Sequence, residues 1–272
     1  MRISHIEPIR FTPFLSNDTR AVAGTTYISA ELLRKDDSTR LGPMAEYTIV
    51  LPNQTHGDRV TWVTEENVKG LSDNSTLIDT RRLFPETDAL LTTLRGLALG
   101  VRTADCLPVL LYARDIQAVG AVHAGWRGTL SGIVGKTVDE LVKAGSKPEN
   151  IIVRFAPAIC GECYEVSQDL AERFVAAGLG ASVHTAPELD PLTDSAMAPD
   201  KPHINLVKAN EILLTRAGMP SANFYQSDLC TRHTSLVIAG VNGMDTHYPY
   251  YSYRRVPGTT RRNTSFVLLL PK

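Results

Sequence analysis

The sequence predicts an α+β fold in which strands and helices alternate along one continuous chain. Apolar runs of strand length recur between residue 47 and the C-terminus, and segments with apolar residues at helical spacing separate them. The 272 residues are 43% hydrophobic, which is enough to bury a substantial core. Because no composition break or low-complexity linker divides the chain, we expect residues 1–272 to form a single domain.

The first half of the chain contains apolar runs that end beside polar or turn-forming residues. We predict strands there at Tyr47–Leu51, Arg59–Val63, Leu97–Val101, Val109–Tyr112 and Ala118–Val122. The N-terminal forty or so residues carry no comparably clear pattern.

The second half adds helices and further strands. Thr129–Ala144 has helical periodicity, with Gly145 as its C-terminal stop. Ser167 is a candidate N-cap for a helix through Ala177, and Asn205 is one for a helix over Leu206–Ala217. Strands are predicted at Ile151–Phe155, Leu236–Ala239 and Ser265–Leu270, and a proline-rich loop at Thr185–Pro202.

The charge balance favours a small-molecule partner, and the absence of long apolar runs bears on where the protein is located. The 28 Lys and Arg residues balance 29 Asp and Glu residues, so the sequence has no electrostatic signature of binding to nucleic acid or to an anionic membrane. The first residues contain no apolar run of signal-peptide length, and no later stretch is long enough to span a membrane, so we expect a cytoplasmic protein. The four cysteines should then be reduced thiols, which favours metal or catalytic roles.

Two histidines and a cysteine form a candidate metal site. His56, Cys106 and His123 each lie close to the end of an apolar segment, where strand ends place functional groups at a cleft. Two imidazoles and one thiolate are the ligand set of an open catalytic zinc site. The alternative is that Cys106 is a small buried hydrophobe and each histidine makes an ordinary hydrogen bond.

Arginines near two predicted loops are candidates for binding an anion. Arg127 lies in a strand-to-helix turn, Gly125–Thr129, whose free N–H groups and guanidinium suit a phosphate. The alternative is a tight turn that the glycines allow, with Arg127 on the solvated surface. Arg254 and Arg255 belong to a second basic segment near the C-terminus, which either binds phosphate or forms a solvated surface.

The spacing Cys160-Gly161-Glu162-Cys163 fits a redox dithiol or half of a structural zinc site. The sequence offers no second C-x-x-C and no nearby pair of histidines. We therefore expect a turn in which one sulfur packs in the protein interior.

Five motifs together resemble the laccase-domain family, the YfiH-like group, and they occur in order from about residue 47 to the C-terminus. They are Gln54-Thr55-His56-Gly57, Thr103-Ala104-Asp105-Cys106-Leu107-Pro108, His123-Ala124-Gly125-Trp126-Arg127-Gly128, Cys163-Tyr164-Glu165-Val166 and Ser252-Tyr253-Arg254-Arg255. The resemblance implies a layered α/β/β/α domain with mixed sheets and a zinc or copper ion on His56, Cys106 and His123. It also implies phosphorolysis of purine nucleosides, with adenosine deamination and methylthioadenosine cleavage as companion activities.

The laccase label itself conflicts with the sequence. A four-copper oxidase needs many histidines, including His-x-His pairs, whereas this chain has 7 histidines and none lies two positions from another. A trinuclear copper cluster is therefore excluded.

Three functions fit the residues. The first is a zinc-dependent purine nucleoside phosphorylase in which Arg127, Arg254 and Arg255 position phosphate or ribose. The second is a metal-free hydrolase of amide or peptidoglycan-precursor substrates, in which His123 deprotonates Cys106 and Asp105 or backbone groups orient the pair. The third is a nucleotide-sensing or partner-binding domain without turnover. The sequence carries no signal for an oligomeric state.

Overall fold

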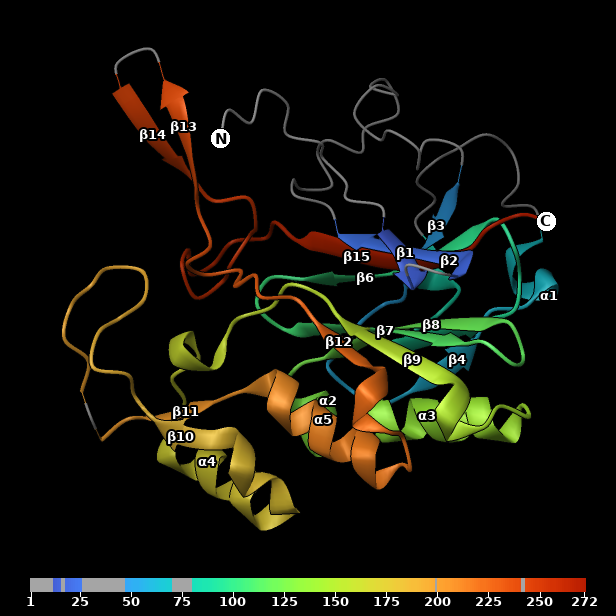
Figure 1. Ribbon diagram of the computed structural model, residues 1–272, viewed down its shortest axis with the longest axis horizontal. Helices are drawn as coiled ribbons and strands as arrows, with labels where there is room; N and C mark the ends of the chain where they lie inside the picture. Colours follow the sequence, from blue (N-terminus) through green and yellow to red (C-terminus); the bar gives the residue numbers. More distant parts are fainter. Residues whose placement is uncertain (1–11, 16–17, 26–46, 70–79, 199, 241–242) are drawn as a thin grey trace.

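A computed structural model describes residues 12–15, 18–25, 47–69, 80–198, 200–240 and 243–272. Two large sheets pack face to face, and helices cover the outer face of one of them (Figure 1). Both sheets combine parallel and antiparallel neighbours. The predicted α+β class with layered, mixed sheets is confirmed.

The first large sheet contains five strands. In spatial order they are β1 (Thr12–Leu15), β2 (Asp18–Thr25), β15 (Asn263–Leu269), β6 (Leu97–Thr103) and β3 (Thr48–Val50). β3 runs parallel to β6, and the other neighbours are antiparallel. The sequence did not predict β1 and β2, because β2 depends on pairing with β15, more than two hundred residues downstream.

The second large sheet contains six strands. In spatial order they are β12 (Phe224–Gln226), β9 (Ile151–Phe155), β7 (Leu107–Ala113), β8 (Ala118–Ala124), β5 (Ala89–Thr92) and β4 (Val60–Trp62). Alternate side chains of β7 pack on opposite faces, with Leu110 and Tyr112 between the sheets and Val109 and Leu111 beneath the helices. A strand buried on both faces requires a continuous apolar run, which is the pattern that predicted β7.

Two short hairpin-like sheets lie outside this pair. They are β10 (Val183–Thr185) with β11 (Pro202–Ile204), and β13 (Leu236–Gly240) with β14 (Gly243–His247). The predicted proline-rich loop is the connection between β10 and β11.

The described α-helices are short. They are α1 (Glu65–Val68), α2 (Trp126–Leu130), α3 (Ile133–Lys143), α4 (Gln168–Phe174) and α5 (Leu206–Arg216). Ser167 and Asn205 accept hydrogen bonds from backbone N–H groups of the helices that they precede, so both predicted N-caps are confirmed. No helix in the described ranges has the length and apolar character needed to cross a bilayer.

The prediction of one helix over Thr129–Ala144 is wrong, because the chain breaks it at Gly132. That glycine has a φ of 75°, in the left-handed region, and separates α2 from α3. α3 then buries one apolar face against the six-stranded sheet, and Gly145, with a φ of 103°, follows its end as predicted.

Candidate metal centre and substrate pocket

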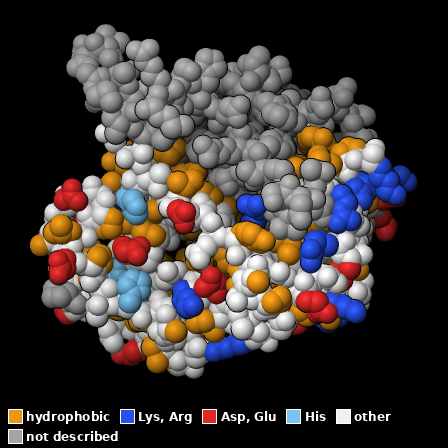
Figure 2. All heavy atoms as spheres, in the orientation of Figure 1, with side chains coloured by type: hydrophobic (Ala, Val, Ile, Leu, Met, Phe, Trp, Pro, Cys, Tyr) orange, Lys and Arg blue, Asp and Glu red, His pale blue; other side chains and the backbone are white. Residues whose placement is uncertain are grey.

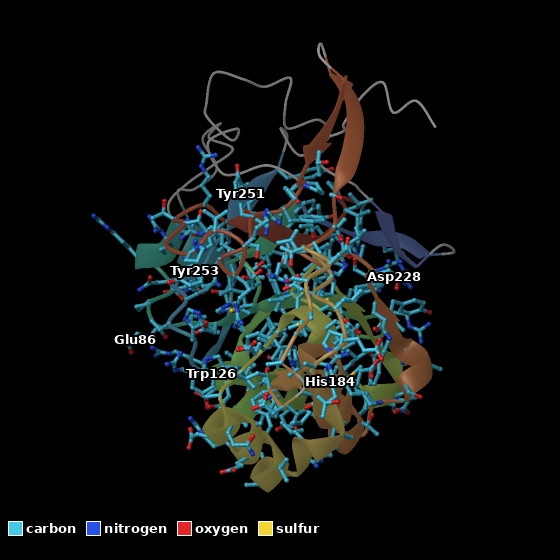
Figure 3. All side chains as sticks on the ribbon, turned by 90° about the vertical axis from the view of Figure 1, so that its left-hand side faces the viewer. Glu86, Trp126, His184, Asp228, Tyr251 and Tyr253 are labelled. Carbon is cyan, nitrogen blue, oxygen red and sulfur yellow. The ribbon has the colours of Figure 1, made fainter. Side chains whose placement is uncertain are left out.

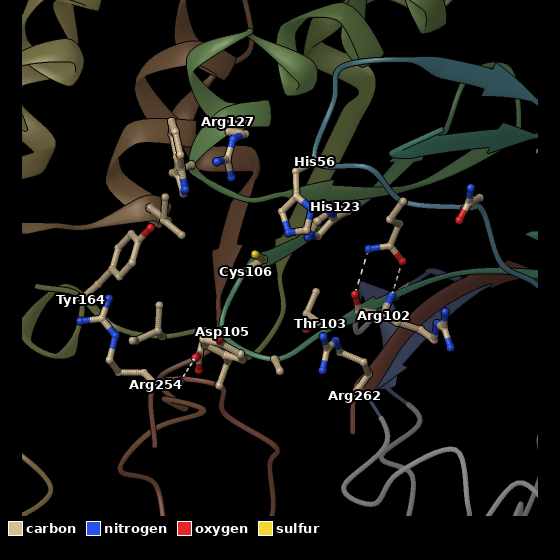
Figure 4. Close-up of a pocket in the computed structure, with 17 residues that line it drawn as sticks. His56, Arg102, Thr103, Asp105, Cys106, His123, Arg127, Tyr164, Arg254 and Arg262 are labelled. Atoms are coloured by element: carbon tan, nitrogen blue, oxygen red, sulfur yellow. Dashed lines mark hydrogen bonds between the residues drawn. The ribbon is translucent and has the colours of Figure 1, made fainter. Parts of the chain in front are cut away.

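The structure brings His56, Cys106 and His123 together where the chain crosses between the two large sheets. Cys106 ends the crossing from β6 to β7, His123 lies in β8, and His56 lies in the loop after β3. The nitrogen and sulfur atoms that could bind a metal all lie within 4.8 Å of one another (Figure 4). The pairing of β7 with β8 places Pro108 opposite His123 and so brings Cys106 close to it.

A buried aspartate that the sequence analysis did not identify organises both histidines. Asp88 precedes β5 and is fully buried, and the pairing of β5 with β8 places it beside His123. Its Oδ1 lies 2.7 Å from His123 Nδ1. A carboxylate at this position holds the proton on Nδ1 and leaves Nε2 available to a metal.

The same carboxylate fixes the loop that carries His56. It accepts backbone N–H bonds from Thr55 (3.0 Å), His56 (3.0 Å) and Gly57 (2.8 Å). His56 has a φ of 63°, which is unusual for a residue other than glycine. These three bonds supply the constraint that holds this backbone conformation in place.

The three candidate ligands perturb one another electrostatically. Burial alone would raise the pKa of the Cys106 thiol, but the imidazoles of His123 and His56 lower it to about 6. Burial would lower the pKa of His123, whereas Cys106 and Asp88 raise it to about 9. The carboxyl pKa of Asp88 is lowered: burial opposes ionisation, and His123 with the loop N–H groups outweighs it.

This donor set fits zinc. Two imidazoles and a readily ionised thiol match a three-ligand catalytic zinc site, and a carboxylate on the second nitrogen of a histidine ligand is the usual outer support. No methionine is among the described lining residues, so the pocket lacks the axial thioether usual in a blue-copper centre.

A cavity of about 580 Å³ opens above these residues. Trp126 and Tyr253, which both line it, are labelled in Figure 3. Four arginines line the cavity, and Asp105 is the one carboxylate among its described lining residues. The arginines are Arg102, Arg127, Arg254 and Arg262. Acidic and basic side chains both occur on the outer face seen in the space-filling view (Figure 2).

Asp105 does not orient the Cys106–His123 pair as the hydrolase hypothesis expected. Its Oδ1 accepts a hydrogen bond from the Thr231 hydroxyl (2.7 Å), and its Oδ2 accepts one from the backbone N–H of Arg254 (2.7 Å). Asp105 therefore anchors the C-terminal segment to the pocket, and Asp88 is the residue that orients His123.

Of the three arginines expected to bind substrate, the pocket includes two. Arg127 and Arg254 line it, with Arg254 held by the carbonyl of Glu165 (2.9 Å). Arg255 points elsewhere, because its guanidinium donates to the backbone carbonyls of Thr231, Arg232 and Tyr250. Arg255 is therefore not among the described residues that line this pocket, where it was expected to bind substrate.

A substitution at Gly125 tests how tightly the candidate metal ligands are packed. A Cβ at Gly125 would lie 3.0 Å from Cys106 Sγ and 3.3 Å from His56 Cδ2. We expect Gly125→Ala to displace these groups and weaken zinc binding about tenfold or more, since overpacking costs about 1–3 kcal/mol. Competition with a chromophoric chelator measures the affinity.

Gly135 provides the matched control. A Cβ at this position in α3 would meet no atom within 4 Å. Gly135→Ala should keep wild-type zinc affinity and gain up to about 1 kcal/mol of helix stability. Equal zinc affinity in the two variants would show that Gly125 is not part of the metal-site packing.

Comparison with known proteins places this architecture in a family. The family model described as "Multi-copper polyphenol oxidoreductase laccase" matches residues 34–270. The crystal structure of the hypothetical protein YfiH from Bacillus licheniformis superposes with a TM-score of 0.70 over 97% of this chain and 100% of that chain, at 24% identity. The crystal structure of YlmD from Geobacillus stearothermophilus gives a TM-score of 0.68 over 95% of this chain and 94% of that chain, at 26% identity.

Two curated relatives carry activity names. Adenosine deaminase RL5, from an unknown prokaryotic organism, is 35% identical over 75% of this chain and 74% of its own length. A purine nucleoside phosphorylase of Deinococcus radiodurans is 37% identical over 66% of this chain and 60% of its own length. The resemblance predicted from the sequence motifs is confirmed: the chain belongs to the multi-copper polyphenol oxidoreductase laccase family, the group with the YfiH-like fold.

Proposed function

We propose that this protein is a zinc-dependent purine nucleoside phosphorylase. The observation that carries the proposal is the open donor set of His56, Cys106 and His123 beneath a cavity of about 580 Å³ lined by four arginines. A cavity of this size suits a small molecule, and its charge suits phosphate.

The proposed ligands are His123 Nε2, the Cys106 thiolate and a ring nitrogen of His56. A zinc ion held there would supply a Lewis acid, which both deamination and glycosidic-bond chemistry can use. Asp88 keeps the proton on His123 Nδ1 and fixes the loop that carries His56. The protein thus presents the two imidazoles in one arrangement before substrate arrives.

The arginines of the pocket would hold the phosphate. Arg127 stacks on the ring of Trp126 at 4.1 Å, and its side chain is exposed to the cavity. Arg254 lies 5.5 Å from the ring of Tyr164 and is tied to the Glu165 carbonyl. The helix that begins at Trp126 is a single short turn, so we assign phosphate binding to these guanidinium groups and not to a helix dipole.

Neutral groups in the pocket suit the nucleoside. Tyr164 offers an aromatic ring for the purine, and burial raises the pKa of Tyr164 to about 12, so its hydroxyl stays protonated at neutral pH. The buried Thr103 hydroxyl has no hydrogen-bond partner within the described part of the protein. Because Thr103 also lines the cavity, a rotation of its side chain would offer this hydroxyl to a ribose hydroxyl or a base nitrogen.

Adenosine deamination and methylthioadenosine cleavage are proposed as companion activities of the same site. The relative named adenosine deaminase RL5 supports the first. Both use the purine ring and the sugar that the pocket would bind, and both are measured by chromatography of adenosine and methylthioadenosine reactions.

Phosphate should be a required cosubstrate for glycosidic cleavage. With inosine or adenosine, we expect ribose-1-phosphate and free base in phosphate buffer, and no cleavage without phosphate. Arg127→Gln should raise the KM for phosphate about tenfold to a hundredfold, since a hydrogen bond to a charged group contributes about 1.5–3 kcal/mol. Initial rates at varied phosphate concentration measure this effect.

Arg173→Gln is the matched control. Arg173 stacks on the same Trp126 ring at 5.1 Å but is not among the lining residues, so its loss should leave the KM for phosphate unchanged. Free ribose released at the same rate in phosphate-free buffer would identify a hydrolase and contradict the proposal.

One observation favours the hydrolase as a second candidate. A thiol with a pKa of about 6 beside an imidazole with a pKa of about 9 has the electrostatics of a cysteine nucleophile and its base. This candidate requires turnover of amide or peptidoglycan-precursor substrates without metal and a covalent adduct on Cys106. In this candidate His56 contributes only by helping to lower the pKa of the Cys106 thiol.

A further inference from the structure

A second cluster of metal-binding side chains lies outside the proposed catalytic site. Cys160, Cys163, Cys230 and His233 place one ligand atom each within 4.8 Å of the other three. From the sequence alone, the first two cysteines are expected to form a turn with one packed sulfur. The structure instead brings both of them to a cysteine and a histidine about seventy residues downstream.

Each pair of ligands occupies one tight turn. Cys160 and Cys163 flank a 3-10 turn closed by a bond from Cys163 N–H to the Cys160 carbonyl. Cys230 and His233 lie in a second turn, in which Thr234 N–H donates to the Cys230 carbonyl. Residues three apart in such turns project to the same side, as in C-x-x-C and C-x-x-H zinc motifs.

A backbone bridge holds the two turns against each other. Ala158 pairs with Cys230 in a parallel bridge, and Thr231 N–H donates to the Ala158 carbonyl at 2.9 Å. The four side chains are thus brought together by the fold itself.

The separations match tetrahedral coordination. Zn–S of about 2.3 Å and Zn–N of about 2.0 Å place a sulfur and a nitrogen ligand about 3.5 Å apart in a tetrahedron. His233 Nδ1 lies 3.7 Å from Cys160 Sγ and 3.2 Å from Cys163 Sγ. Cys163 and Cys230 are buried, and Cys160 and His233 are half-buried, so little room remains for a water or substrate ligand.

The surroundings also suit a cluster with excess negative charge. Three thiolates, a neutral imidazole and Zn²⁺ carry a net charge of −1. The Arg232 guanidinium lies 3.5 Å from Cys163 Sγ and is itself held by Asp190. Backbone N–H groups of Cys160 (3.3 Å) and Arg232 (3.4 Å) donate to Cys230 Sγ, as outer-shell groups do for thiolate ligands.

We propose that Cys160, Cys163, Cys230 and His233 bind a structural zinc ion in a closed Cys3His site. The ion would tie together two segments that form the wall of the substrate pocket. Ile159 and Tyr164, on either side of the first ligand pair, both line the pocket. Thr231, next to Cys230, donates to Asp105, whose other oxygen holds the Arg254 backbone.

The test counts metal and does not depend on nucleoside turnover. Full-length protein is purified under reducing conditions, loaded with zinc, desalted and measured for zinc per chain by mass spectrometry. We expect two zinc ions in the wild type, one in Cys106→Ala, one in Cys163→Ser and none in the double variant. Cys163→Ser should also unfold at a lower temperature.

His184→Asn is the matched control. His184 is exposed and adjoins Gly161, where its Nε2 would lie 3.2 Å from an added Cβ, but it is not in the cluster. This variant should keep two zinc ions.

Cobalt substitution identifies the ligands even if Cys163→Ser does not fold. Cobalt bound to Cys106→Ala should show the strong thiolate-to-metal charge-transfer band of three cysteine ligands. Absence of tightly bound metal in Cys106→Ala would overturn the proposal. A second outcome would also overturn the proposal. Protein purified without reductant would bind no second metal, and its mass would be lower by two hydrogens because of a Cys160–Cys163 disulfide. That result would identify a redox dithiol.

Discussion

Replacing Cys106 with alanine is expected to remove the metal proposed to bind with His56 and His123 and to abolish the proposed nucleoside turnover. A three-ligand zinc site that loses its thiolate retains two imidazoles, which bind zinc weakly. The fold should persist, because Cys106 lies in the crossing between β6 and β7 and its partly buried side chain belongs to neither large core cluster. We expect a change in unfolding free energy of about 1 kcal/mol or less. Zinc analysis, initial rates and thermal unfolding measure the three effects.

Alkylation of the wild type distinguishes a metal ligand from a nucleophile. With zinc bound, Cys106 should resist iodoacetamide; after chelation it should react, because a pKa of about 6 makes the metal-free thiol mostly thiolate above that pH. Peptide mapping separates Cys106 from the other three cysteines. Turnover by chelated protein, together with a substrate adduct on Cys106, would replace the zinc enzyme with the cysteine hydrolase.

The sequence predicted those elements whose signal is local. Apolar runs located β7, β8 and β9, and polar caps located the starts of α4 and α5. The break between α2 and α3 was missed because helical periodicity continues through Gly132, where only the backbone conformation changes. β2 was missed for a different reason: its pairing partner is the last strand of the chain.

In the candidate site, too, residues with a local sequence signal were predicted and a residue placed by long-range strand pairing was not. His56, Cys106 and His123 lie close to the ends of the apolar runs that predicted strands, so their convergence could be expected. Asp88 is a lone carboxylate before β5, and it reaches His123 only through a strand register that the sequence does not display.

The sequence also could not distinguish the roles of adjacent residues of the same type. Arg254 lines the pocket while Arg255 binds backbone carbonyls, and no pattern of residue types distinguishes two adjacent arginines. Likewise, Cys230-x-x-His233 completes the first cysteine pair only because Ala158 pairs with Cys230 across the fold.

Asp88→Asn is expected to have the largest effect of any substitution that leaves all three proposed zinc ligands in place. Asp88 accepts bonds from His123 Nδ1, from the N–H groups of residues 55–57 and from the Thr55 hydroxyl. An asparagine has one accepting oxygen and one NH2 group. If the oxygen faces His123, the NH2 group opposes the Thr55 and Gly57 donors; if it is flipped, the NH2 group opposes His123 Nδ1.

Either orientation damages the metal site. The first leaves buried donors unsatisfied, at about 1–3 kcal/mol each, and releases the His56 loop. The second favours the tautomer with a proton on Nε2, the nitrogen that would bind zinc. We therefore expect zinc affinity to fall about tenfold to a hundredfold and the free energy of unfolding to fall by about 2–4 kcal/mol. Chelator competition and chemical denaturation measure these changes.

Asp58→Asn is the control that isolates this effect. Asp58 lies in the same loop as His56, but it is exposed and pairs with Lys136 on the surface. Its loss should change the unfolding free energy by less than about 1 kcal/mol and leave zinc affinity unaltered. Nitrogen NMR of His123 distinguishes loss of its orientation from a general loss of protein stability. If Asp88 orients His123, the tautomer of the His123 ring should change in Asp88→Asn even under conditions where the variant is fully folded. If Asp88→Asn keeps wild-type zinc affinity and the His123 tautomer is unchanged, then the packing of β8 alone orients His123. Asp88 would then only hold the loop that carries His56.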